Sequence, residues 1–198
     1  MSEIICVTDP GLCREGIEKR LELIAAARPA AVILRAKTLS AAGYRALAEK
    51  ARDICEKHGV KLILHGFVDE ALALGHDAVH LPLPELRKLD SSTKKRFDII
   101  GASCHSVEDA LEAQSLGCRY IVAGHIFDTD CKKGIPARGL DFLSSVCRAA
   151  DIPVYAIGGI TPANLPSVLE RGAAGACVMS ALMTRDDPGK YLEELKNV

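Results

Sequence analysis

The chain has 198 residues, of which 48% are hydrophobic and 26% charged, and its formal net charge is −1. This length and composition are typical of one globular domain with a sizeable core, not of a disordered chain. The balanced charge gives no general attraction to nucleic acid or to anionic membranes. No apolar run reaches the roughly 20 residues of a membrane helix, and the N-terminus lacks the pattern of a signal peptide. We therefore expect a cytoplasmic protein that binds neither nucleic acid nor membranes.

Eight cysteines are spread along the chain without a Cys-x-x-Cys pair. Most of them lie among the apolar residues of predicted strands and helices, where a reduced thiol behaves as a small hydrophobic side chain. The sequence therefore predicts structural thiols and indicates neither a zinc site nor a disulfide framework.

Short apolar segments rich in β-branched residues recur along the chain, and a helical stretch follows each of them. In chain order, the predicted strands are 4–8, 31–35, 62–65, 78–81, 99–102, 120–123, 154–157 and 175–178. Near-continuous apolar runs of this kind are typical of parallel strands buried on both faces. The clearest helices, 15–27 and 40–58, each carry one apolar stripe.

Parallel strands need helical crossovers, and eight βα units predict closure into an α/β fold of the (β/α)8 TIM barrel type. A doubly wound open sheet is the alternative fold, but no Gly-x-Gly-x-x-Gly motif follows the first strand. No linker or low-complexity tract divides the chain. We therefore expect one barrel domain over residues 1–198.

Chemistry in such a barrel belongs to the C-terminal ends of the strands and to the loops that follow them. Four of the six histidines fall at this end, although the strands are otherwise almost wholly apolar. A single histidine there would often have only a structural role. Together with Arg35, Lys37 and Lys132, however, the histidines favour a site for a small anionic substrate.

The last two loops supply candidates for binding a phosphate. Gly158 and Gly159 follow the seventh strand, and Met179 and Ser180 follow the eighth. Barrels commonly bind phosphate at this position through backbone N–H groups. The alternative is that the two glycines only form a tight turn.

Several motifs in one order now suggest a family. They are Leu34-Arg35-Ala36-Lys37, Asp77-Ala78-Val79-His80-Leu81, Gly101-Ala102-Ser103-Cys104-His105, Ala156-Ile157-Gly158-Gly159-Ile160-Thr161 and Val178-Met179-Ser180. Through them the chain resembles the thiamine phosphate synthase superfamily from end to end. The resemblance implies a (β/α)8 fold and a magnesium-dependent reaction that joins a pyrimidine pyrophosphate to a thiazole phosphate.

Three departures from the synthase pattern argue against that reaction. Ile33 stands where synthases carry a glutamine, and His65-Gly66 stands where they carry an Asn-Asp pair whose aspartate binds magnesium. The second magnesium aspartate aligns with Glu85. Glycine has no side chain to bind a metal, and Mg²⁺ in phosphate chemistry usually needs one or two carboxylates.

The segment Gly124 to Gly134, Gly-His-Ile-Phe-Asp-Thr-Asp-Cys-Lys-Lys-Gly, looks like the thiazole tautomerase branch, the TenI proteins. That resemblance implies an isomerase that aromatises a carboxythiazole phosphate tautomer, with His125 as the catalytic acid and base and with no cofactor or metal. Two alternatives stay open: a thiamine phosphate synthase, and a non-catalytic TenI-type regulatory or ligand-binding protein. The family also suggests a homodimer.

The resemblance and the barrel pattern together give a set of candidate site residues. Those expected to contact the phosphorylated thiazole substrate are Arg35, Lys37, Ser103, His105, Thr129, Cys131 and Lys132. Those expected to bind its phosphate are Gly158, Gly159, Met179 and Ser180. Lys37, Lys132 or Arg35 would hold the substrate carboxylate, and a lysine could also stabilise charge that develops on the ring.

Overall fold

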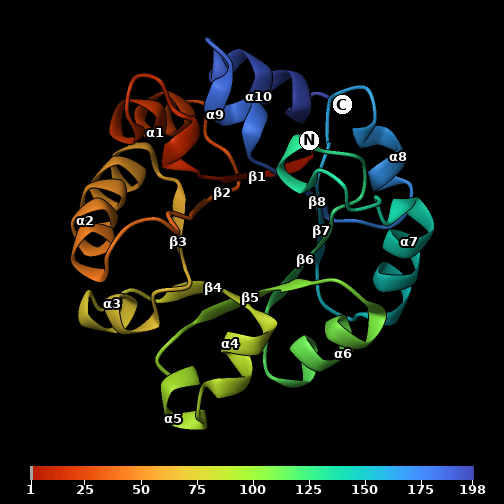
Figure 1. Cartoon of the computed structure of the whole chain (residues 1–198), viewed down its shortest axis with the longest axis horizontal. Helices are drawn as coiled ribbons and strands as arrows, with labels where there is room; N and C mark the ends of the chain where they lie inside the picture. The colour runs from red at the N-terminus through yellow and green to blue at the C-terminus, as the bar shows by residue number, and fades with distance from the viewer. Residues whose placement is uncertain (1) are drawn as a thin grey trace.

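A computed structural model describes residues 2–198 and closes eight parallel strands into a barrel in chain order (Figure 1). The strands are β1 (Glu3–Val7), β2 (Ala31–Leu34), β3 (Lys61–His65), β4 (Ala78–Pro82), β5 (Ile99–Cys104), β6 (Tyr120–Gly124), β7 (Val154–Ile157) and β8 (Gly175–Val178). The pairing of β1 with β8, in which Ile5 lies opposite Cys177, completes the ring. The predicted (β/α)8 barrel is confirmed, and the open sheet is excluded.

Helices form a ring outside the strands (Figure 1). They are α1 (Ile17–Ala26), α2 (Ala41–His58), α3 (Val68–Ala73), α4 (Leu83–Lys88), α5 (Ser91–Lys94), α6 (Val107–Ser115), α7 (Gly139–Ala149), α8 (Leu165–Leu169), α9 (Ser180–Thr184) and α10 (Pro188–Lys196). Two short 3-10 turns, η1 (Pro10–Leu12) and η2 (Asp130–Lys132), lie in the loops after β1 and β6. Within residues 2–198, none of the helices has both the length and the apolar character that crossing a membrane requires.

The two long helices have the ends that their sequences favour. The side chain of Ser40 accepts a hydrogen bond from the backbone N–H of Gly43 at the start of α2, and Gly59 takes a left-handed conformation, with a φ of 67°, at its end. The first helix begins at Ile17 and not at residue 15, because Gly16 has a φ of 89° that a helix cannot contain.

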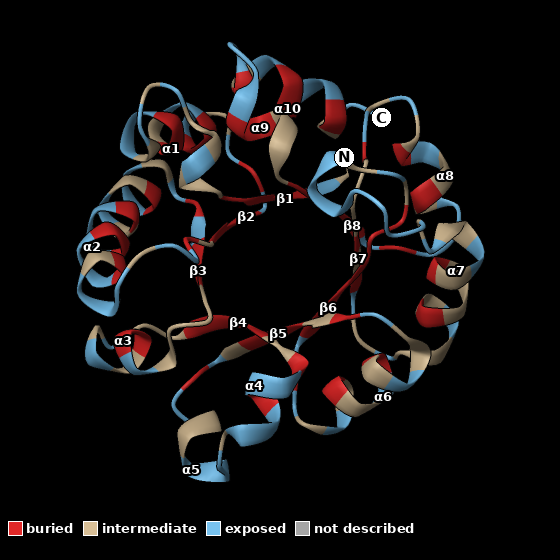
Figure 2. Ribbon diagram, viewed as in Figure 1, coloured by how far each residue is buried: buried red, intermediate tan, exposed pale blue. Residues whose placement is uncertain are grey.

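Strand side chains alternate between two hydrophobic clusters, and most strand residues are buried (Figure 2). The larger cluster packs the outward-facing side chains against the helices. The smaller cluster fills the barrel with Ile5, Val7, Ala31, Ile33, Ile63, Ala78, Tyr120, Val122 and Cys177. Ile33, the first departure from the synthase pattern, thus belongs to the apolar cluster inside the barrel.

The cysteines are free, and five of them are buried: Cys6, Cys55, Cys104, Cys118 and Cys177. Burial raises the pKa of the Cys55 thiol to about 11 and that of the Cys118 thiol to about 12, so these thiols stay protonated and unreactive. Cys131 differs because it is exposed, in the loop after β6.

Candidate active site

His125 directly follows β6, and only 8% of it is exposed. Its Nε2 lies 3.1 Å from the carbonyl oxygen of Ile135, and its own carbonyl oxygen accepts a hydrogen bond from the backbone N–H of Arg138 at 2.9 Å. The peptide bond between Gly124 and His125 is cis. Through the contacts with Ile135 and Arg138, the loop that leaves β6 folds back onto His125 and holds its ring in place.

The two glycines after β7 pack directly against this segment. A Cβ on Gly158 would lie 2.3 Å from Cβ of His125, and a Cβ on Gly159 would lie 2.6 Å from the carbonyl oxygen of Asp128. Both glycines have positive φ, at 101° and 65°. Beside the two roles that the sequence suggested, these glycines let the loop after β6 approach the loop after β7 closely.

His105 supports the same segment from β5. Its Nδ1 lies 2.8 Å from the carbonyl oxygen of Gly124, the residue that precedes His125. Its backbone N–H donates to Oδ2 of Asp109 at 2.9 Å. Although His105 is largely exposed, its ring is turned toward β6, where it helps to position the backbone of His125.

The C-terminal ends of the strands and the loops that follow them form the mouth of the barrel. A polar network lies deeper in the barrel, beneath this mouth. Nε2 of His80 contacts Oγ of Ser103 at 2.8 Å, and its Nδ1 contacts the phenol of Tyr120 at 3.0 Å. The ring of His65 stacks against that of His80, with 5.5 Å between the centroids. The network connects Ser103, a candidate substrate contact, to groups that are buried in the barrel.

The two stacked histidines are neutral at neutral pH. Burial lowers the pKa of His80 to about 3, and the neighbouring His65 adds to the effect. Burial also lowers the pKa of His65 to about 4, with further contributions from the positive charges of Arg35 and Lys37. A neutral imidazole both donates and accepts hydrogen bonds, so His80 can serve two partners.

Three cations, Arg35, Lys37 and Lys132, lie near one another at the mouth. Arg35 forms an ion pair of 2.8 Å with Asp9. Partial burial and the positive charges of Arg35 and Lys132 hold the pKa of Lys37 below its ordinary value, so these three side chains lie within each other's electrostatic reach. Within residues 2–198, Lys37 and Lys132 form no ion pair, so their charges are available to an anion.

The loop after β6 also reaches the last candidate phosphate-binding element. Sγ of Cys131 lies 3.1 Å from Oγ of Ser180, the first residue of α9. The side chain of Thr129 accepts a hydrogen bond from the backbone N–H of Cys131 at 3.4 Å. Met179, between β8 and α9, packs against both hydrophobic clusters.

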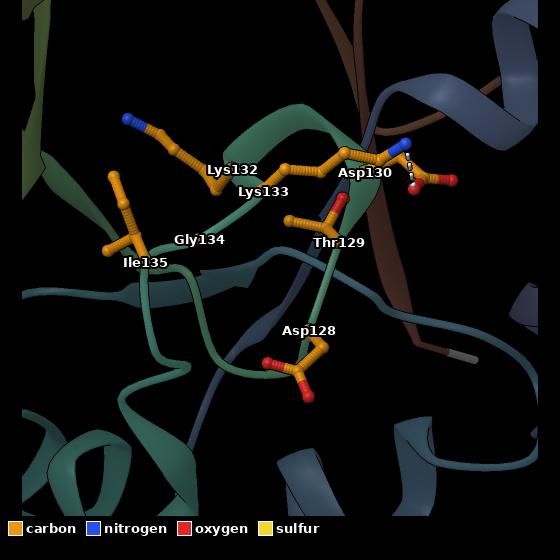
Figure 3. Close-up of a pocket in the computed structure, with 7 residues that line it drawn as sticks. All are labelled: Asp128, Thr129, Asp130, Lys132, Lys133, Gly134 and Ile135. Carbon is orange, nitrogen blue, oxygen red and sulfur yellow. Dashed lines mark ion pairs between the residues drawn. The ribbon is translucent and has the colours of Figure 1, made fainter.

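A pocket of about 360 Å³ lies on the loop itself (Figure 3). It is lined by Asp128, Thr129, Asp130, Lys132, Lys133, Gly134 and Ile135. Lys133 pairs with Asp130 at 3.3 Å, whereas the side chain of Lys132 points away from this pair (Figure 3). Of the candidate site residues only Thr129 and Lys132 line this pocket, so the other candidates lie outside it.

The residues at the synthase metal positions do not fit a magnesium ion. Gly66 offers no side chain, and the carboxylate of Glu85 is exposed and paired with Lys88 at 2.8 Å. Within residues 2–198, no three His, Cys, Asp or Glu side chains are grouped so as to hold a metal ion.

Sequence reasoning missed three contributors to the site. Two are the backbone carbonyls of Gly124 and Ile135, which contact His105 and His125, and no sequence pattern marks a carbonyl acceptor. The third is Tyr120, whose phenol reaches His80. A tyrosine within a buried strand does carry a signal, because its hydroxyl needs a partner.

Comparison with known proteins finds consistent similarity along the whole chain. A family model described as thiamine monophosphate synthase matches residues 4–182. The chain is 38% identical over 203 residues to a thiamine-phosphate synthase of Methanocella arvoryzae, covering 99% of this chain and 94% of that protein. It is 34% identical to a thiamine-phosphate synthase of Synechococcus sp. (strain WH7803) over 98% of this chain, and it spans only 56% of that relative's length.

A solved structure is also similar to this chain. The thiamine phosphate pyrophosphorylase of Pyrococcus furiosus superposes with a TM-score of 0.85 at 29% identity. The superposition covers 98% of this chain and 94% of that one.

Proposed function

Because the chain belongs to the thiamine monophosphate synthase family, we propose that it is an enzyme of thiamine biosynthesis that acts on a phosphorylated thiazole as a thiazole tautomerase. The observation that carries the proposal is His125, a histidine whose ring is held at the mouth of the barrel by the loop after β6. An imidazole positioned in this way can take a proton from one carbon of a substrate and return it to another near neutral pH.

In the proposed reaction, His125 removes the proton from ring C2 of the carboxythiazole phosphate tautomer, and the electron pair of that C–H bond moves into the ring. The resulting imidazolium returns a proton to the exocyclic ylidene carbon, and the thiazole becomes aromatic. Atoms and charge balance within the substrate, so no electron or group carrier takes part. Positioned acid–base groups typically contribute ~10²–10⁴-fold to a rate.

The charges around the mouth support a substrate with two anionic groups. Lys37 and Lys132 would hold the carboxylate, because the charge of Arg35 is already partly offset by Asp9. Ser180 and the backbone around Gly158 and Gly159 would bind the phosphate, at the end of the barrel where phosphate sites commonly lie. The contact between Cys131 and Ser180 supports this arrangement, since it brings the loop after β6, with its proposed thiazole contacts, beside the proposed phosphate site at Ser180.

The names of the relatives favour a second candidate, the coupling reaction of a thiamine phosphate synthase. Against it stand the residues of this chain at the metal positions, Gly66 and Glu85, which do not fit magnesium. A non-catalytic protein that only binds a thiazole phosphate is the third candidate.

Conversion of the carboxythiazole phosphate tautomer, followed by NMR without magnesium, tests the proposal. We expect the wild type to accelerate the conversion and the His125→Gln variant to lose ~10²-fold or more of the rate. His76→Gln is the matched control, because the ring of His76 also faces a carbonyl oxygen, that of Leu62 at 3.1 Å, but before β4 and away from the mouth.

The same samples discriminate the alternatives. The synthase would be established instead if the tautomer is converted no faster than in buffer alone and the protein couples a pyrimidine pyrophosphate to the thiazole with magnesium. Binding of the thiazole phosphate with neither reaction would establish the ligand-binding protein. The homodimer, the cytoplasmic location and the independence from cofactors remain predictions.

A further inference from the structure

Two histidines at the barrel mouth each face one backbone carbonyl, but through different ring nitrogens. Nε2 of His125 faces the oxygen of Ile135 at 3.1 Å, whereas Nδ1 of His105 faces the oxygen of Gly124 at 2.8 Å. A carbonyl oxygen only accepts hydrogen bonds, so the nitrogen that faces it carries the proton. These contacts fix opposite tautomers, Nε2–H for His125 and Nδ1–H for His105.

From this geometry we infer that Nδ1 of His125 is the atom that accepts and returns the proton, and that the Ile135 carbonyl is its positioning group; the inference rests on the proposed function. In the neutral ring only Nδ1 has a free lone pair. When the C2–H bond of the substrate breaks, the new N–H bond forms at Nδ1 while Nε2–H stays on the carbonyl. The carbonyl thereby holds the orientation of the ring, as an acceptor on the far nitrogen of a catalytic histidine does in general.

The positioning group lies on the loop that carries the proposed substrate contacts. The backbone N–H of Ile135 donates to the carbonyl oxygen of Lys132 at 3.1 Å. The backbone N–H of Lys132 in turn donates to the carbonyl oxygen of Thr129 at 3.0 Å. This short chain of hydrogen bonds connects Thr129 to Ile135 around the pocket (Figure 3). The carbonyl that orients the base therefore belongs to the same loop as the proposed substrate contacts, and 54% of Ile135 itself is exposed.

The tautomers can be measured without any substrate. The experiment is a long-range ¹H–¹⁵N correlation spectrum of the full-length ¹⁵N-labelled protein at about pH 8.5, above the ordinary pKa of imidazole. We expect the Nε2–H pattern for His125 and the Nδ1–H pattern for His105. His76 is the internal reference for Nε2–H, because its Nε2 faces a carbonyl. The variants His125→Gln, His105→Gln and His76→Gln assign the signals.

A glycine variant tests the coupling through the loop. Gly134 has a φ of 79° with nothing within 4 Å of an added Cβ, so Gly134→Val strains the backbone next to Ile135 without a clash. We expect an Nδ1–H population of His125 to appear. We also expect kcat for the carboxythiazole phosphate tautomer to fall about tenfold, which is less than the full rate contribution of a positioned base. Gly117→Val is the control, since Gly117 has a φ of 94° and equally open space before β6.

The outcomes separate this inference from the proposed function. An Nδ1–H tautomer for His125 in the wild type overturns the inference, even if the enzyme converts its substrate. An Nε2–H tautomer that is unchanged in Gly134→Val overturns the coupling through the loop. An Nε2–H tautomer in a wild type that does not convert the substrate overturns the proposed function and leaves the protonation of His125 established.

Discussion

Tyr120 and His80 are joined inside the barrel by a hydrogen bond of 3.0 Å between the phenol oxygen and Nδ1 of the imidazole. The phenol reaches the imidazole by lying across Gly101 on the neighbouring strand β5, where an added Cβ would come within 2.1 Å of the tyrosine ring. The other nitrogen of His80 contacts Ser103. A glycine, a tyrosine and a histidine from three adjacent strands thus orient one hydroxyl beneath the mouth.

The first prediction concerns the space at Gly101. Gly101→Ala places a methyl group 2.1 Å from the ring of Tyr120, which must move away from His80. We expect the free energy of unfolding to fall by about 1–3 kcal/mol, the usual cost of overpacking a core, as measured by urea denaturation. Gly43→Ala in α2 is the control, because its nearest neighbour would lie at 3.4 Å, and it should change stability little. A Gly101→Ala protein as stable as the wild type contradicts this packing.

The second prediction concerns acid stability. Burial holds the pKa of His80 near 3 in the folded protein, whereas an unfolded histidine titrates near 6.5. Between these values the unfolded chain binds a proton that the folded chain does not, so the free energy of unfolding falls as the pH drops below about 6.5. From pH 7 to pH 5 we expect His80 to account for a loss of roughly 2 kcal/mol.

His80→Asn gives the comparison for that loss, because asparagine keeps hydrogen-bonding capacity and does not titrate. Urea unfolding of the wild type and the variant at pH 7 and at pH 5 measures it. The variant should lose less stability than the wild type between the two values. Equal losses would show that His80 is not the group responsible.

The barrel could be predicted because each strand is an apolar run with polar residues at one end, and this pattern can be recognised within each segment by itself. The same pattern placed His125, Lys37 and Ser180 at the mouth. The partners of the histidines could not be predicted in this way. The contact of His125 with Ile135 spans ten residues of irregular loop, and its acceptor is a backbone atom common to every residue.

The packing roles of the glycines could not be predicted from the sequence either. The sequence gives two reasons for glycine at 158 and 159, a tight turn or the approach of a phosphate. The close packing against His125 and Asp128 is a third reason, and it depends on how two loops meet in space. The glycine at 101 likewise makes room for Tyr120 from the next strand, which no property of its own segment indicates.

The third prediction concerns the substrate carboxylate. Lys37→Gln removes a charge that lies near Arg35 and Lys132, and we expect KM for the carboxythiazole phosphate to rise about tenfold, the loss of one partly screened charge pair. Lys133→Gln removes the same charge from an exposed side chain already paired with Asp130, so it should leave KM unchanged. Steady-state kinetics measure both variants. Equal effects would mean that net charge, not Lys37 itself, attracts the substrate.

The fourth prediction concerns where the phosphate lies. Because Sγ of Cys131 is 3.1 Å from Oγ of Ser180, a carboxylate at position 131 would face a phosphate bound at Ser180. We expect Cys131→Asp to raise KM at least about tenfold through repulsion between like charges, while Cys131→Ser keeps KM near the wild-type value because a hydroxyl can make the same contact. Ser115→Asp adds an equal charge at the exposed end of α6, before β6 and away from the mouth, and should have no effect. If Cys131→Asp binds the substrate as the wild type does, the phosphate lies elsewhere on the barrel rim, and Ser180 serves only to hold the loop after β6.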